Sequence, residues 1–293
     1  MMPGDSVISG KTRVCGVIGD PVEHTMSPVM HNAAFRELGL DYVYLPFRVR
    51  KEELDKAVEG MKALNMRGLN VTIPHKVAVM PLLDELDPLA KKIGAVNTIV
   101  NDGGRLRGYN TDADGFLQAL LEREIEPKGK SVVILGAGGA ARAISFILAE
   151  RGARLAILNR KQELDWAVEL AQRISAEFKE GVDALELNEE NMAGVLGEAD
   201  ILVNATSVGM SPDSDRTPVP AKLLRPGLVV FDIVYNSVRT RLLQEAGQVG
   251  ARTIGGLEML VWQGALAFRK WTGREAPREM MQQKAIEALG NEN

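Results

Sequence analysis

The feature that most constrains the fold of this chain is a glycine-rich turn between an apolar, β-branched segment and a helix-forming one. The segment Ser131–Leu135 is apolar, and the six residues that follow it, 136–141, read GAGGAA, in the pattern G-x-G-x-x-A. A helix-forming stretch, 140–151, and a second apolar stretch, 154–158, complete a strand–turn–helix–strand unit. Because two strands joined in this way lie parallel in one sheet, the pattern predicts an α/β fold with a doubly wound sheet.

The same turn predicts a dinucleotide-binding site, because its small residues have separate physical roles. Gly136 permits the tight turn, Gly138 lets the backbone approach a pyrophosphate, and Ala141 allows the helix to pack closely on the strand. The helix N-terminus offers N–H groups and the positive end of the helix dipole to an anion. A glycine-rich turn in a fold that has lost its nucleotide is the alternative. The residues expected to bind the cofactor here are Gly136, Ala137, Gly138, Gly139, Ala140 and Ala141.

The residues at the end of the second strand favour NADP over NAD. An NAD site usually places Asp or Glu at this point to hold the ribose 2′-hydroxyl. This chain has Asn159, Arg160 and Lys161 instead, and two cations there favour the 2′-phosphate of NADP. Arg160 can also stack on the adenine face. The alternative is that Arg160 and Lys161 are solvated charges at the start of a helix.

The composition is that of a globular protein with about two domains. Of the 293 residues, 45% are hydrophobic, and the net charge is −4, so we expect no affinity for nucleic acid or an anionic membrane. Cys15 is the only cysteine and lies in an apolar run, which predicts a buried, inert thiol and a reducing, cytoplasmic location. Met1–Thr12 lacks the apolar core of a signal peptide, and no stretch reaches the roughly 18 apolar residues of a membrane helix.

Alternating strand-like and helix-like segments indicate a second α/β domain. We expect a first domain of residues 1–112 with a mainly parallel sheet, a Rossmann-type domain of residues 113–255, and tail helices in 256–293 that return to the first domain. In the first domain we expect strands at 13–19, 42–49 and 68–73, helices at 27–38, 51–64, 77–86 and 88–93, and a hairpin of 95–101 with 105–109. Beyond it we expect strands at 200–204 and 228–233 and helices at 114–123, 257–271 and 277–289.

Lys76 is the candidate for proton transfer, because it follows directly on a short β-branched strand. Pro74 ends the pairing of that strand and holds the backbone just before Lys76. Strand ends of α/β sheets face the ligand crevice, where a lysine can exchange a proton with a bound substrate. For this stretch alone, a solvated lysine after a turn is the alternative.

Two further segments carry polar residues that a purely apolar core does not need. Thr25 and Ser27 bring two hydroxyls to one side of an extended segment, where they can hold a carboxylate without a buried cation. Helix capping by Ser27 is the alternative. Asn97 interrupts a strand that otherwise has a buried pattern.

Helix ends account for some of the remaining polar residues. Thr111 and Asp114 fit a capping pair, so Asp112 or Asp114 is either a site residue or part of a helix cap. Gln263 borders the apolar stripe of its helix, either at the rim of a site or on the surface.

Metal binding is not indicated by the sequence. His24, His31 and His75 show no zinc spacing with one another or with Cys15, and we expect His31 to face outward on its helix.

With these segments in one order, the chain resembles the shikimate dehydrogenase family over nearly its full length. The motifs that carry the resemblance are H-[ST]-x-S-P at His24–Pro28, N-V-T-x-P-[HFL]-K at Asn70–Lys76, G-A-V-N-T at Gly94–Thr98, G-Y-N-T-D at Gly108–Asp112, the GAGGA-A turn, N-A-T-S-x-G-M at Asn204–Met210, D-x-x-Y at Asp232–Tyr235 and G-x-x-M-L-x-x-Q at Gly256–Gln263.

The resemblance implies the reversible, NADP-dependent reduction of 3-dehydroshikimate to shikimate, a step toward chorismate and the aromatic amino acids. It implies that Lys76 and Asp112 are the catalytic pair and that the small-molecule substrate is the main partner; a homodimer is compatible with the sequence. It assigns Thr25 and Ser27 to the substrate carboxylate and the following residues to substrate binding: Asn70, Thr72, Asn97, Asp112, Gln263 and, near the substrate, Tyr235. On the nicotinamide and ribose side of the cofactor it assigns Thr206, Ser207, Ile233 and Gly256.

Two departures from the family pattern leave alternatives open. Thr25 stands where the family usually has serine, and the segment after Arg160 has two extra residues and lacks a second cation, for which Lys161 can substitute. An NAD-linked dehydrogenase that oxidises quinate as well as shikimate is one alternative. A nucleotide-sensing regulatory protein without catalysis is another, and the presence of Lys76 and Asp112 argues against it.

Overall fold

The computed structural model describes residues 8–291, and its contacts divide the chain into two compact units. The first comprises Met1–Gly115 with Val261–Asn293, and the second comprises Phe116–Leu260. The divisions fall inside helices α4 (Asp112–Leu121) and α9 (Gly256–Thr272), a few residues beyond the expected boundaries after 112 and 255. Most of Met1–Thr12, where we expect no signal peptide, lies outside the described residues.

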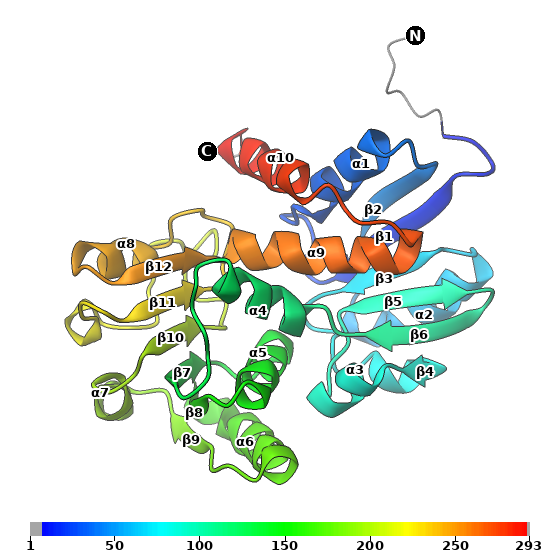
Figure 1. Ribbon diagram of the computed structural model, residues 1–293. Helices are drawn as coiled ribbons and strands as arrows, with labels where there is room; N and C mark the ends of the chain where they lie inside the picture. Colours follow the sequence, from blue (N-terminus) through cyan, green and yellow to red (C-terminus); the bar gives the residue numbers. More distant parts are fainter. Residues whose placement is uncertain (1–7, 292–293) are drawn as a thin grey trace. The chain divides into compact units, whose positions relative to one another are not determined.

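The first unit contains a six-stranded sheet in the order β2-β1-β3-β5-β6-β4 (Figure 1). β1 is parallel to both β2 and β3, whereas β5 is antiparallel to β3 and β6, so the sheet is mixed but mainly parallel. Its strands are β1 (Arg13–Gly19), β2 (Tyr42–Arg48), β3 (Gly68–Val71), β4 (Glu85–Leu86), β5 (Thr98–Asp102) and β6 (Arg105–Tyr109). Its remaining helices are α1 (Ser27–Glu37), α2 (Leu54–Ala63), α3 (Pro88–Ile93) and α10 (Arg278–Asn291).

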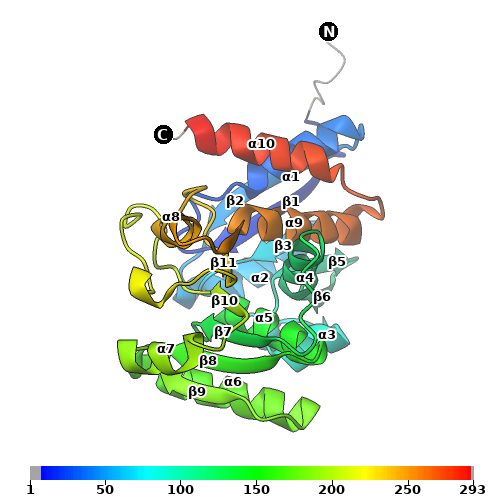
Figure 2. The same ribbon diagram turned by 60° about the vertical axis from the view of Figure 1, so that its left-hand side comes forward.

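The apolar spacing of the sequence explains how these elements pack. Helix α2 buries Leu54, Val58 and Met61, which follow one another at helical spacing and join the core beside β1 and β3. Cys15 is fully buried in β1, and burial raises the pKa of its thiol, as expected for an inert cysteine. Helix α10 packs against α1, which confirms that the tail returns to the first unit (Figure 2).

The prediction of a helix over 77–86 is wrong. The segment forms only a 3₁₀ turn at Met80–Leu82 and then the short strand β4. Pro81 lies inside that turn and cannot donate an N–H to a continuing helix. The Leu106 N–H instead donates to the Asp84 carboxylate (2.7 Å), and the Asp84 N–H donates to the Leu106 carbonyl (3.0 Å). These contacts draw the segment to the edge of the sheet.

The second unit contains an entirely parallel sheet in the order β12-β11-β10-β7-β8-β9. The order reverses direction between β7 and β10, and ligands of such sheets bind outside the carboxyl ends of the strands at that point. The strands are β7 (Ser131–Leu135), β8 (Arg154–Asn159), β9 (Asp183–Glu186), β10 (Ile201–Asn204), β11 (Val229–Asp232) and β12 (Arg252–Gly255). The helices, besides its parts of α4 and α9, are α5 (Gly139–Glu150), α6 (Leu164–Phe178), α7 (Glu189–Leu196) and α8 (Arg241–Gln248).

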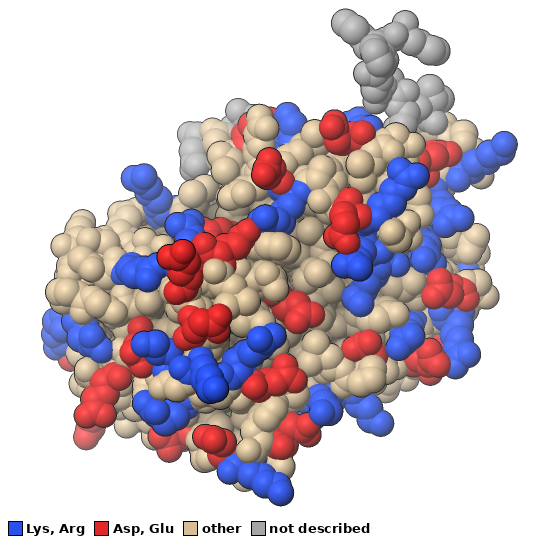
Figure 3. Space-filling view, in the orientation of Figure 1, with Lys and Arg blue, Asp and Glu red and all other residues tan. Residues whose placement is uncertain are grey.

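The surface carries charges of both signs. On the face shown in Figure 3, Lys and Arg side chains alternate with Asp and Glu, in keeping with the net charge of −4. Within residues 8–291, no helix combines the length and the apolar character that crossing a membrane requires.

Asp232 is a buried carboxylate that joins three segments of the second unit. At the end of β11 it accepts hydrogen bonds from Thr240 Oγ1 (2.6 Å), Asn204 Nδ2 (2.9 Å) and the Val234 N–H (3.1 Å). Burial raises the pKa of Asp232 to about 6, although these hydrogen bonds favour its charged form.

The raised pKa predicts how stability depends on pH. The folded protein binds the Asp232 proton more tightly than the unfolded chain, so this contribution is complete below about pH 4 and is lost as the pH rises through about 6. Asp232→Asn cannot titrate and therefore does not lose this contribution as the pH rises. The unfolding free energy of the variant relative to that of the wild type should increase by roughly 2 kcal/mol from pH 4 to pH 7. Urea unfolding at both pH values measures the difference. Asp200→Asn is the control and should shift the other way, because the Ser131 N–H lowers the pKa of Asp200.

Candidate active site

The loop after β3 holds Lys76 in a fixed position. The buried His75 ring donates from Nε2 to the Val49 carbonyl (2.7 Å), and the Val96 N–H donates to the Lys76 carbonyl (2.8 Å). The loop begins with Thr72, whose N–H donates to the Ile18 carbonyl of β1 (2.9 Å). The Lys76 side chain is 17% exposed, so the alternative of a solvated surface lysine is wrong.

Asp112 faces Lys76 from the first residue of α4. Lys76 Nζ lies 2.7 Å from Asp112 Oδ2, and the aspartate side chain is only 6% exposed. Asn110 Oδ1 accepts the N–H groups of Asp112 (3.0 Å) and Ala113 (3.2 Å), so Asn110 caps this helix. The predicted capping pair of Thr111 and Asp114 is therefore wrong, and the carboxylate of Asp112 is available to the lysine.

Asn97 joins this ion pair to the other buried polar residues. Its Nδ2 donates to Asp112 Oδ1 (2.9 Å) and to Gln263 Oε1 (3.3 Å). Gln263 is 8% exposed, which contradicts the surface alternative, and α9 approaches α4 closely because Gly115 has no side chain there. Asn70 is likewise buried, at 6% exposure, and donates to the Asn97 carbonyl (3.2 Å).

Thr25 and Ser27 lie where the chain leaves β1 and enters α1. The Ser27 N–H donates to Thr25 Oγ1 (3.3 Å), and Ser27 is the first residue of the helix. The N-cap is Met26, with no side-chain hydrogen bond, so the alternative that Ser27 caps the helix is wrong. Thr72, at the end of β3, packs its methyl group where a side chain at Gly19 would clash.

The glycine turn of the second unit fits a dinucleotide pyrophosphate. Gly136 has φ +102°, and a Cβ there would lie 3.0 Å from the Ala205 carbonyl oxygen, so only glycine suits the turn. Gly138 is exposed, and no described atom lies within 4 Å of the position that its Cβ would take. Gly138 is the N-cap of α5, and because glycine has no side chain to cap the helix, the N–H groups of the first turn stay open to an anion.

The other residues expected on the cofactor side follow neighbouring strands of the same sheet. Thr206, after β10, lies against Gly136 and donates its hydroxyl to Asn204 Oδ1 (2.7 Å), and Ser207 beside it is exposed. Ile233, after β11, meets Gly256, where an added Cβ would lie 2.1 Å from the Ile233 carbonyl oxygen. Tyr235 follows on the same segment and is half-buried.

At the end of β8, Arg160 has an acidic partner that was not expected from the sequence. Asn159 is buried and donates to the Glu163 carbonyl (2.7 Å), and Lys161 is exposed in a 3₁₀ turn. Arg160 pairs through Nε (2.7 Å) and Nη2 with the Glu163 carboxylate, which raises the pKa of Arg160 and lowers that of Glu163. The sequence signal that could have revealed this ion pair is Glu163, an acidic residue four positions after the last residue of β8.

His31 does not face outward as expected. It is fully buried among aromatic rings, and burial lowers its pKa to about 3, so the imidazole is neutral. Among the residues that the structure describes, no group of three or more His, Cys, Asp or Glu side chains could hold a metal ion.

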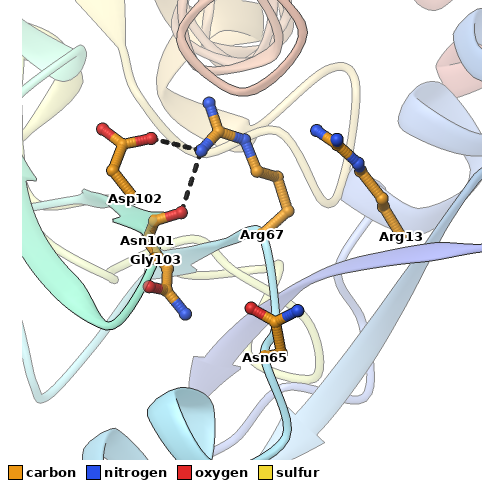
Figure 4. Close-up of a pocket in the computed structure, with 6 residues that line it drawn as sticks. All are labelled: Arg13, Asn65, Arg67, Asn101, Asp102 and Gly103. Carbon is orange, nitrogen blue, oxygen red and sulfur yellow. Dashed lines mark hydrogen bonds and ion pairs between the residues drawn. The ribbon is translucent and has the colours of Figure 1, made fainter.

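A cavity of about 370 Å³ in the first unit is separate from the Lys76–Asp112 pair. It is lined by Arg13, Asn65, Arg67, Asn101, Asp102 and Gly103 (Figure 4). Arg67 is engaged there by the carboxylate of Asp102 and by the Asn101 carbonyl (2.8 Å), so this cavity holds a structural ion pair and none of the expected site residues.

A parallel sheet with a glycine turn at its point of reversal, in one chain with a buried lysine–carboxylate pair, defines a dehydrogenase that uses a nicotinamide dinucleotide. Three family descriptions match the chain: "Shikimate dehydrogenase substrate binding domain" at residues 17–99, "Shikimate / quinate 5-dehydrogenase" at 119–217 and "Shikimate 5'-dehydrogenase C-terminal domain" at 256–286. The chain belongs to the shikimate dehydrogenase family.

Similar proteins match nearly the whole chain. The shikimate dehydrogenase (NADP(+)) of Methanopyrus kandleri is 52% identical, over 96% of this chain and 98% of that protein. A crystal structure of shikimate dehydrogenase in complex with NADP+ is 46% identical, with a TM-score of 0.90 over 97% and 98% of the two chains. The Thermus thermophilus shikimate 5-dehydrogenase, in complex with NADP(H) and shikimate, is 39% identical, with a TM-score of 0.83 over 94% and 100%.

The two glycines of the turn should respond differently to alanine. Gly138→Ala has a permitted backbone and open space, so the melting temperature should stay unchanged, while NADP affinity should fall about 10-fold or more because the methyl group occupies the path of the pyrophosphate. Gly136→Ala should lower the unfolding free energy by about 1–3 kcal/mol, because of its positive φ. Thermal unfolding and NADP titration test both. Normal NADP affinity in Gly138→Ala would place the pyrophosphate elsewhere.

Proposed function

We propose that this chain catalyses the reversible, NADP-dependent reduction of 3-dehydroshikimate to shikimate, a step in the biosynthesis of chorismate and the aromatic amino acids. The observation that carries the proposal is the largely buried contact of Lys76 with Asp112, in a chain that is about half identical to NADP-dependent shikimate dehydrogenases. The unit that holds the ion pair binds substrate, and the unit with the glycine turn binds NADP.

Lys76 supplies the proton of the reaction. Reduction of the ring carbonyl forms an alkoxide, and Lys76 Nζ donates a proton to it and takes it back in the reverse direction. Asp112 orients the ammonium group and accepts a hydrogen bond from the same substrate hydroxyl. When bound, NADPH supplies the hydride from C4 of its nicotinamide ring.

The remaining polar residues hold the substrate. The hydroxyls of Thr25 and Ser27 bind its carboxylate, and Asn70, Thr72, Asn97 and Gln263 bind the ring hydroxyls, with Tyr235 nearby. Because most of these groups are buried, a substrate that lacks a ring hydroxyl leaves them unpaired and is rejected.

The glycine turn and the end of β8 bind the cofactor. The first-turn N–H groups of α5 receive the pyrophosphate, and Arg160 and Lys161 receive the 2′-phosphate. Thr206, Ser207, Ile233 and Gly256 line the nicotinamide and ribose side. We also propose a cytoplasmic location, supported by the single buried thiol, and a homodimer, which light scattering tests.

Lys76→Ala should lower kcat by about 10²–10⁴-fold and change KM for shikimate little, because the variant loses the proton donor but keeps the binding groups. Steady-state kinetics measure both constants. Lys62→Ala is a matched control, since Lys62 forms a similar contact with Asp84 (2.9 Å) on the surface of the same unit. Near-normal kcat in Lys76→Ala would remove the lysine from the mechanism.

One assay separates the proposal from its alternatives. Absorbance of the reduced nicotinamide is followed with NADP+ or NAD+ and with shikimate or quinate. The proposal requires the highest kcat/KM for NADP+ with shikimate. A preference for NAD+ with quinate would favour the NAD-linked enzyme, and tight NADP+ binding without turnover would favour a regulatory protein.

Glu163 should weaken selectivity for the 2′-phosphate, because its carboxylate occupies Arg160 and repels a phosphate. Glu163→Gln should bind 2′,5′-ADP about 3-fold more tightly, the size of one exposed charge interaction, and 5′-AMP as before. Calorimetric titration of the full chain measures both. Asp165→Asn removes the same charge from an exposed position nearby and serves as control. Weaker binding of 2′,5′-ADP by Glu163→Gln would instead mean that Glu163 orients the arginine.

A further inference from the structure

We infer that Tyr44 and Thr98 are positioning residues for the catalytic pair. Their hydroxyls belong to a buried chain of hydrogen bonds that runs in one direction through the first unit and ends on Asp112. The inference rests on the proposed roles of Lys76 and Asp112. It extends them, because neither Tyr44 nor Thr98 is among the residues expected to contact substrate or cofactor.

This series of hydrogen bonds has four consecutive links. Tyr44 Oη lies 2.7 Å from Asn70 Oδ1, and Asn70 Nδ2 lies 3.1 Å from Thr98 Oγ1. Thr98 Oγ1 lies 3.0 Å from Asn97 Oδ1, and Asn97 Nδ2 lies 2.9 Å from Asp112 Oδ1. All five residues are at most 6% exposed, so water cannot replace a missing link at little cost.

Two backbone groups fix the direction of every link. The Asn97 carbonyl can only accept, and it lies 3.2 Å from Asn70 Nδ2, so the amide oxygen of Asn70 must face Tyr44. The Thr111 N–H can only donate, and it lies 2.7 Å from Asn97 Oδ1, so the amide nitrogen of Asn97 must face Asp112. Tyr44 therefore donates to Asn70, and Thr98 donates to Asn97 while it accepts from Asn70.

This assignment limits what Asn70 can offer to a substrate. Both of its N–H groups are used, one by the Asn97 carbonyl and one by Thr98 Oγ1. The remaining capacity is on Oδ1, where Tyr44 already donates to one lone pair. Asn70 can thus bind a substrate hydroxyl that donates a proton, and it discriminates against a keto or carboxylate oxygen at that point.

Tyr44 is held firmly enough to act as the start of the chain. Its backbone N–H and carbonyl are both bonded to the Asn32 side chain (2.8 and 2.9 Å), and its ring stacks on His31, with centroids 4.5 Å apart and planes 14° apart. Trp271 packs on the same cluster and donates from Nε1 to the Ile99 carbonyl (3.0 Å). The ring of Tyr44 cannot turn its hydroxyl away without disrupting this packing.

Tyr44→Phe tests the start of the chain, because it removes the hydroxyl and keeps the ring. We expect kcat/KM for shikimate to fall about 10-fold, the equivalent of one buried hydrogen bond, with KM for shikimate raised and KM for NADP+ unchanged. Partial unfolding would lower kcat with both KM values normal, whereas a displaced Asn70 weakens shikimate binding and raises its KM. Tyr42→Phe is the matched control on the same strand; its hydroxyl contacts Arg13 and the Trp271 carbonyl, and wild-type kinetics are expected.

Thr98 provides a second, independent test in the middle of the chain. Thr98→Val interrupts the chain and should show the same rise in KM for shikimate as Tyr44→Phe, whereas Thr98→Ser keeps the hydroxyl and should restore near-normal kinetics. The double variant Tyr44→Phe/Thr98→Val should be little worse than either single variant, because both substitutions release the same side chain, Asn70.

The outcomes separate this inference from the proposed function. If Lys76→Ala is inactive but Tyr44→Phe and Thr98→Val behave like Tyr42→Phe, the positioning role is wrong and the proposed function stands. If Thr98→Ser is as impaired as Thr98→Val, the hydroxyl is not the reason and the inference fails. Near-normal kcat in Lys76→Ala would overturn both, since Asp112, on which the hydrogen bonds end, would then have no catalytic lysine to orient.

Discussion

The contact between Lys76 and Asp112 is the interaction on which the proposed chemistry of this protein depends. A largely buried ion pair is costly unless other hydrogen bonds replace the lost water. Here Asn97 donates to the second carboxylate oxygen, and the backbone of Asp112 is capped by Asn110. These amide groups therefore replace part of the hydrogen bonding that Asp112 loses when it is removed from water.

The candidate sites of the two units are built from different groups: polar side chains in the first unit, and small residues with backbone N–H groups in the second. The first places polar side chains in or beside β3, β5 and β6 and joins several of them by hydrogen bonds, which hold them in place. The second relies on small residues and backbone: Gly136 and Gly138 keep the end of β7 clear, and the N-terminus of α5 provides the N–H groups. Side chains suit the proposed recognition of ring hydroxyls, whereas backbone N–H groups suit the pyrophosphate that every dinucleotide shares.

Strongly patterned segments were predicted well, and weakly patterned ones were not. β1, β6 and β7 match their predicted ranges, because each is a short apolar or alternating run with a clear turn beside it. The expectation of a helix over 77–86 failed because Pro81 and the bonds of Asp84 to Leu106 outweighed an apolar pattern. The edge strands β9 and β12 and helices α7 and α8 were not anticipated, and α6 was expected only as a helix beginning near Arg160. The edge strands are only partly buried, so their sequences carry little apolar signal.

By itself the sequence determined the dinucleotide turn, the α/β class and the position of Lys76 in the segment that follows a strand, because each depends on the conformational limits of a few consecutive residues; the strand itself ends at Val71, two residues before the predicted end. Only the tertiary structure decided which side chains cap helices, which are buried and which form ion pairs. It showed that Asn110 caps α4, that His31 is buried under Tyr44 and that Glu163 binds Arg160. These outcomes depend on contacts between residues far apart in the chain or on side-chain directions, which local pattern does not specify.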